Sequence, residues 1–73
     1  MQPYKNLDGN SGVADYQIGE DRITVRFTDG NEYLYTYTSA GSINIEKMKE
    51  LAISGRGLNG FINTTVKKKY VHF

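Results

Sequence analysis

The first half of the chain has a hydrophobic pattern with a period of two. Over residues 22–28, branched and aromatic side chains at every second position alternate with polar ones, and tyrosines occupy every second position from Tyr33 to Tyr37. A weaker alternation covers residues 14–18. This pattern is typical of strands that bury one face, and it predicts three short antiparallel strands within residues 13–37. The apolar set of the second and third strands consists of Ile23, Val25, Phe27, Tyr33 and Tyr35.

The turn between the second and third strands sets which side chains share a face. A two-residue loop would place Val25 opposite Leu34 and would turn the tyrosines toward the polar face. A three-residue loop ending at a left-handed Gly30 places Val25 opposite Tyr33 instead. Because a slip of one residue exchanges the two faces, only one of these registers can hold. We predict the three-residue loop, which gathers the apolar side chains on one face and sets the charged residues of the two strands opposite each other.

The second half changes to a helical period. The first helical stripe consists of Ile45, Met48, Leu51 and Ala52. We expect residues 38–44 to form a loop, Ser42 or Asn44 to cap this helix, and a left-handed Gly55 to end it.

A second helix is expected to begin near Asn59. Its apolar stripe consists of Leu58, Phe61, Ile62, Thr65 and Val66. Since Lys69 would project from the middle of that stripe, either the helix ends at Lys67 or Lys68, or the Lys69 side chain snorkels to reach solvent. The tail 70–73 is mostly apolar and is expected to lie back on the core.

These elements predict an α+β domain in which a three-stranded antiparallel meander sheet is followed by two helices packed on one face. Residues 1–12 are polar and read as an N-terminal arm, and residues 13–73 form the single domain. The chain of 73 residues has no cysteine, so a disulfide framework and a thiolate metal site are both excluded. We see neither a secretory signal nor a stretch of roughly 20 apolar residues, and we expect a cytoplasmic protein without a membrane partner.

The net charge is +1, from nine lysines and arginines against eight acids. A nucleic-acid-binding role therefore requires clustered charges rather than an overall basic excess. Lys67, Lys68 and Lys69 supply such a cluster near the end of the chain, and either a solvated helix terminus or a phosphate-contacting edge explains them. Tyr37, at the end of its strand, is a candidate for stacking on bases.

The segment SGRGLNG contains a formal G-x-G-x-x-G run from Gly55 to Gly60. The dinucleotide fingerprint requires a preceding strand and a βαβ unit, whereas this run follows a helix, so we reject a nucleotide site of that kind. The run is better explained as two adjacent helix boundaries. The alternative is an anion held by free N–H groups at the start of the second helix, with Arg56 beside them.

We find no pattern of catalytic or metal-ligating residues. His72 is the single histidine and has no accompanying nucleophile or acid, and Glu46 and Glu50 lack metal-ligand partners. The loop beginning at Asp8 lacks the bidentate glutamate of a calcium loop. We therefore expect a protein that is not an enzyme and that needs neither a cofactor nor a metal.

An ordered set of motif residues runs through the chain: Ser11, Val25, Phe27, Gly30, Tyr33, Tyr35, Ala52, Ser54, Gly57, Phe61, Asn63, Val66 and Tyr70. This ordered set resembles the KTSC domain family, a small domain also found at the C-terminus of some lysyl-tRNA synthetases. The resemblance implies a small stand-alone module of bacterial or phage origin, and the synthetase attachment implies an accessory that contacts RNA.

Our leading hypothesis is a non-enzymatic module that binds nucleic acid, RNA in particular, weakly through its backbone phosphates. The contacts would come from Arg56, Lys67, Lys68 and Lys69, with Tyr37 as the stacking residue. The alternative is a protein-interaction module in which the first or third strand offers an open sheet edge to a partner strand.

Overall fold

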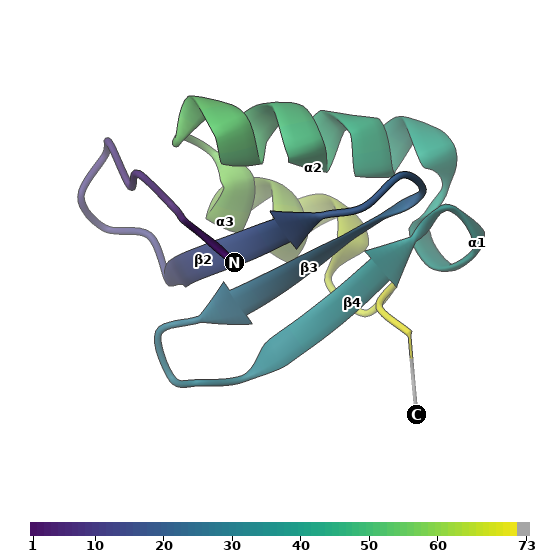
Figure 1. Ribbon diagram of the computed structural model, residues 1–73, viewed down its shortest axis with the longest axis horizontal. Helices are drawn as coiled ribbons and strands as arrows, with labels where there is room; N and C mark the ends of the chain where they lie inside the picture. The colour runs from purple at the N-terminus through teal and green to yellow at the C-terminus, as the bar shows by residue number, and fades with distance from the viewer. Residues whose placement is uncertain (72–73) are drawn as a thin grey trace.

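The computed structural model describes residues 1–71, so the expectations for His72 and Phe73 lie outside the described residues. One antiparallel sheet has its strands in chain order, and the helices cover one of its faces (Figure 1). The elements are β1 (Gln2–Pro3), β2 (Val13–Ile18), β3 (Arg22–Phe27), β4 (Glu32–Thr36), α1 (Tyr37–Ala40), α2 (Ser42–Ser54), α3 (Leu58–Phe61) and η1 (Ile62–Val66). The predicted α+β class and antiparallel sheet are confirmed, but the sheet has four strands instead of three.

The register of the β3–β4 hairpin is the predicted one. Val25 pairs with Tyr33, and Arg26 pairs with Glu32. Gly30 has φ +91°, a left-handed angle that a non-glycine residue adopts only with strain. This angle closes the three-residue loop and turns the apolar residues of both strands toward the helices.

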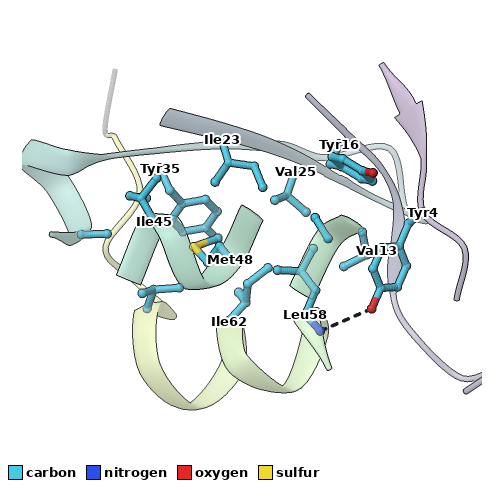
Figure 2. Packing of buried hydrophobic residues seen from close by; sticks show 13 residues of the cluster. Tyr4, Val13, Tyr16, Ile23, Val25, Tyr35, Ile45, Met48, Leu58 and Ile62 are labelled. Carbon is cyan, nitrogen blue, oxygen red and sulfur yellow. Dashed lines mark hydrogen bonds between the residues drawn. The ribbon is translucent and has the colours of Figure 1, made fainter. Parts of the chain in front are cut away.

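The additional strand comes from the segment expected to be a polar arm. β1 pairs with Asp15 and Tyr16 of β2. The chain then turns Tyr4 into the core, where only 7% of it is exposed, and its hydroxyl oxygen accepts a hydrogen bond from the Leu58 N–H at 3.3 Å (Figure 2). A strand of two residues is too short to show a period, so the sequence pattern gave no sign of it.

A β-bulge between Val13 and Asp15 interrupts the weak alternation of β2. As a result Val13 and Tyr16 both face the core, whereas Ile18 at the end of the strand is 39% exposed. On the opposite face of the sheet, the Arg26 guanidinium pairs with the carboxylate of Asp15.

The connection between β4 and α2 is partly helical, which corrects the expected loop. The Thr36 side chain accepts a hydrogen bond from the Ser39 N–H, and the Ser39 hydroxyl accepts one from the Thr36 N–H. This capping box starts α1, and Gly41 then stands at the N-cap of α2. Neither expected cap is used, because Ser42 is already inside α2 and the Asn44 amide donates to the Ala40 carbonyl.

The ends of the two main helical segments follow the prediction closely. Gly55 ends α2 with φ +82°, as expected. The second segment begins at Leu58 as α3 and continues as the π-helical turn η1 to Val66. Leu58, Ile62 and Val66 lie on its buried face, one turn apart.

The core lies between the sheet and the helical layer (Figure 2). Val25, Ile23 and Tyr35 enter it from the sheet, and Ile45 and Met48 enter it from α2, each with 1% or less of its surface exposed. Burial of these side chains and of the others in the same cluster is the main source of stability in a chain of this size.

Candidate nucleic-acid interface

Four aromatic rings cluster at one end of the core. Phe27 and Tyr33 meet edge to face, with ring centroids 5.6 Å apart. Tyr70, from the tail after η1, lies 4.7 Å from Tyr33 and 6.2 Å from Tyr35 between centroids. Rings at these separations and tilts attract one another in addition to the area they bury. The aromatic cluster therefore joins β3, β4 and the tail.

A main-chain hydrogen bond holds the tail beside the sheet. The Val71 N–H donates a hydrogen bond of 2.7 Å to the Leu34 carbonyl on the outer edge of β4. This contact holds the neighbouring Tyr70 against the rings of the hairpin. The tail thus completes a site that the sheet alone does not form.

The cluster opens into a cleft of about 270 Å³, which we call the aromatic cleft. Its lining residues are Phe27, Tyr33, Tyr35, Ile62, Asn63, Lys67, Lys68 and Tyr70. Phe27, Tyr33 and Tyr70 are half-buried, whereas Tyr35 is 1% exposed. Burial, with smaller effects from the hydroxyls of Tyr33 and Tyr70, raises the pKa of Tyr35 to about 12. The prediction that Tyr35 is a core residue is thus confirmed, and Tyr33 lies at the border between core and cleft.

The three lysines are exposed and sit where the helical segment ends. Lys67 follows η1 directly, and the Lys69 N–H donates to the Val66 carbonyl at 2.8 Å to close the turn. Lys67 and Lys68 line the aromatic cleft, whereas Lys69 is not among its lining residues. Two of the predicted cations therefore meet the aromatic cluster.

Arg56 lies elsewhere. It belongs to the loop between α2 and α3, at the opposite end of the α3–η1 segment from the lysines. Its Nε is 3.8 Å from Oδ1 of Asp8, and both side chains are mostly exposed. The Leu58 N–H, which the anion alternative requires, is already hydrogen-bonded to the Tyr4 hydroxyl. This arrangement weakens the anion alternative.

Tyr37 is likewise not among the residues that line the aromatic cleft. Its hydroxyl donates to the Glu46 carboxylate at 2.6 Å, and this bond raises the pKa of Tyr37. The Lys49 ammonium lies 2.8 Å from that carboxylate and 5.7 Å from the Tyr37 ring centroid. The hydrogen bond from Lys49, followed by that from Tyr37, lowers the pKa of Glu46. Tyr37 thus belongs to an acidic surface network, not to the cleft.

Sequence reasoning did not place Asn63 or Tyr70 in the site. Asn63 is exposed on η1 and lines the aromatic cleft. Its spacing of four residues from Lys67 was visible in the sequence, because residues so spaced share one helical face. The apolar tail was expected to lie back on the core, and Tyr70 does pack against it, but the sequence did not indicate that Tyr33 would be its partner.

Within residues 1–71, no three histidine, cysteine, aspartate or glutamate side chains gather in a way that would hold a metal ion. Over the same part of the chain, no helix has the length and apolar character needed to cross a bilayer. Comparison of the chain with protein-family models, curated proteins and solved structures finds no significant match.

Proposed function

We propose that the protein is a non-enzymatic module that binds nucleic acid, RNA in particular, weakly through backbone phosphates at the turn formed by Lys67 and Lys68. The observation that carries the proposal is that Lys67 and Lys68 are both among the lining residues of an aromatic cleft. Cations next to aromatic rings are the combination by which proteins hold single strands.

The small number of cations at the cleft accounts for the expected weakness. For a single strand, log K falls with log salt with a slope of about −0.7 for each phosphate contacted. Two contacts therefore give a slope of about −1.4, so affinity should fall about sevenfold between about 50 and 200 mM salt. Lys69 and Arg56 would act as outer contacts for longer strands, and their loss should matter less.

A titration of labelled single-stranded RNA, single-stranded DNA and tRNA, followed by fluorescence anisotropy at low salt, tests the proposal. The combined Lys67→Glu and Lys68→Glu variant should bind at least about tenfold more weakly than the wild type. The matched control is Lys5→Glu with Lys47→Glu, which changes the net charge equally at exposed positions away from the cleft. Affinity no tighter than millimolar for every ligand, or equal losses in the two double variants, would end the proposal.

We also propose that the chain belongs to the KTSC domain family. Of the residues that carry the resemblance, five line one cleft although they come from four segments of the chain: Phe27, Tyr33, Tyr35, Asn63 and Tyr70. Convergence of motif residues on one concave surface is typical of a shared binding site, and it supports the proposal.

The second candidate is a protein-interaction module that uses the outer edge of β2. β1 pairs only with Asp15 and Tyr16. The Gly19 N–H donates a hydrogen bond to the carbonyl of Arg22 in β3. Successive residues of an antiparallel strand direct their main-chain N–H and C=O groups alternately toward and away from the neighbouring strand, so those of Ile18 point away from β3. A partner strand added there would lose a hydrogen bond in an Ile18→Pro variant, and nucleic-acid binding would not change. Partner capture that is insensitive to this substitution would exclude the β2 edge.

A further inference from the structure

Resting on the proposed function, we infer that the aromatic cleft receives one unpaired nucleobase of a single strand. The base would stack against the aromatic cluster, Asn63 would hydrogen-bond its edge, and Lys67 and Lys68 would hold the adjoining phosphates. The ligand class is therefore a single strand with accessible bases, as opposed to a duplex or a base-free polyanion.

The composition of the cleft matches the chemistry of a nucleobase. Its aromatic walls come from β3, β4 and the tail, and the half-buried rings of Phe27, Tyr33 and Tyr70 contribute both surface and rigidity. Stacking of a base on aromatic side chains raises affinity by about tenfold or more for each base. A phosphate alone would gain nothing from these rings.

The size of the cleft limits what enters it. At about 270 Å³ it is slightly below the usual range of small-molecule sites, roughly 300–1,000 Å³. A single planar base suits such a space, while its sugar and phosphates remain outside next to the exposed lysines. Bases inside a duplex are already stacked and paired, so a duplex would have to open before it could bind in this way.

Asn63 provides the polar group that a base edge requires. Its primary amide both donates and accepts hydrogen bonds, as the Watson–Crick edges of the bases do. It lies on η1, where a π-helical turn replaces the α-helical one. Such turns are rare and occur frequently at functional sites.

Two probes separate base binding from phosphate binding. The first is a single-stranded RNA that carries fluorescent 2-aminopurine, compared with a strand of equal length whose nucleotides are abasic. The second is inorganic polyphosphate, a polyanion without bases. We expect the intact strand to bind at least about tenfold more tightly than either base-free ligand, with a change in 2-aminopurine emission on binding.

Asn63→Ala tests the amide without disturbing the core, because Asn63 is exposed. It should weaken binding of the intact strand about three- to tenfold, the effect of losing one hydrogen bond, and leave binding of the abasic strand unchanged. Asn59→Ala, one helical turn earlier, is the matched control and should bind as the wild type does. Phe27→Leu should likewise weaken binding of the intact strand and leave binding of the abasic strand unchanged.

The possible failures are distinguishable. Equal affinity for the intact strand, the abasic strand and polyphosphate would overturn the base pocket and leave phosphate binding standing. Binding of none of the three ligands would overturn both the base pocket and the proposed function. An effect of Asn63→Ala that is equal for intact and abasic strands would also overturn the base pocket.

Discussion

Tyr4 joins the N-terminal segment to the helical layer, and replacing it separates two contributions to stability. Tyr4→Ala removes a ring of which only 7% is exposed. Truncating a buried aromatic residue costs about 3–5 kcal/mol. The lower value applies here, because Tyr4 also lines a polar cleft with Asn6 and Asn59 that water can enter. We therefore expect a loss of about 3 kcal/mol in the free energy of unfolding.

Tyr4→Phe keeps the ring and removes only the hydroxyl that accepts from the Leu58 N–H. Leaving a buried donor without its partner costs about 1–3 kcal/mol. Because the bond is long, at 3.3 Å, and lies next to the polar cleft, we expect about 1 kcal/mol. The total free energy of unfolding of a chain of this length is about 4–11 kcal/mol, so Tyr4→Ala should remove a large fraction of its stability.

Urea unfolding followed by circular dichroism measures both variants, and the midpoint and slope together give the free energy of unfolding. Tyr37→Phe serves as the control, since the hydroxyl that it removes bonds to Glu46 at the exposed surface and its loss should change stability less than Tyr4→Phe does. If Tyr4→Ala cost less than about 1 kcal/mol, the segment before β2 would not be packed on the core as described. Equal losses for Tyr4→Ala and Tyr4→Phe would show that the ring contributes nothing.

Two further predictions concern backbone geometry and pH. Gly30→Ala should cost about 1 kcal/mol, because φ is +91° but an added Cβ would meet nothing within 4 Å. Gly55→Ala should cost about 2–3 kcal/mol in the same urea assay, because φ is +82° and the added Cβ would stand 2.7 Å from Cβ of Lys5. Equal costs for Gly30→Ala and Gly55→Ala would contradict this close approach. Burial raises the pKa of Tyr35 to about 12 from about 10 in the unfolded chain, so the folded state binds more protons between these values. The contribution of Tyr35 to the free energy of unfolding should be fully present below pH 10, and about 2 kcal/mol of it should be lost as the pH approaches 12. The free energy of unfolding of a Tyr35→Phe variant should fall less over the same range.

The sequence correctly predicted the parts of the fold in which the hydrophobic period and the left-handed backbone angle of a glycine indicate the same arrangement. The β3–β4 register followed from the apolar set together with a left-handed Gly30, and the end of α2 followed from Gly55. In each case a local backbone requirement and a buried face select the same arrangement. The sequence alone was therefore sufficient for the central hairpin and for the helical layer.

The missed elements are short and depend on specific hydrogen bonds. β1 has two residues and α1 has four, so each contains only about one repeat of its hydrophobic pattern, too few for a period to be recognised. The capping box at Thr36 and Ser39 was readable in principle, although its glutamate is replaced by serine. Tyr4 enters the core only because β1 directs it there.

The candidate site was predicted only in part, because closeness in sequence does not give closeness in space. The run of lysines correctly marked a charged helix end, and two of them reach the aromatic cleft. Arg56 and Tyr37, chosen from exposure and charge, lie on other parts of the surface. Asn63 and Tyr70 enter the cleft through a helical face and through the return of the tail to β4, which requires the tertiary fold.

The charge distribution favours docking of nucleic acid at the lysine turn, and it also limits the contribution of long-range attraction to the proposed binding. With a net charge of +1, long-range steering of a polyanion is weak. Near Tyr37 the carboxylates of Glu46, Glu20 and Asp21 outnumber the cations Lys49 and Arg22, so this side is a poorer site for phosphates than the lysine turn. Discrimination among strands must then come from short-range contacts in the aromatic cleft, which salt barely screens. If bases are bound, raising the salt should lower the affinity for intact and abasic strands in parallel and leave their ratio unchanged. A ratio that collapses toward one as the salt rises would mean that charge alone produced the difference.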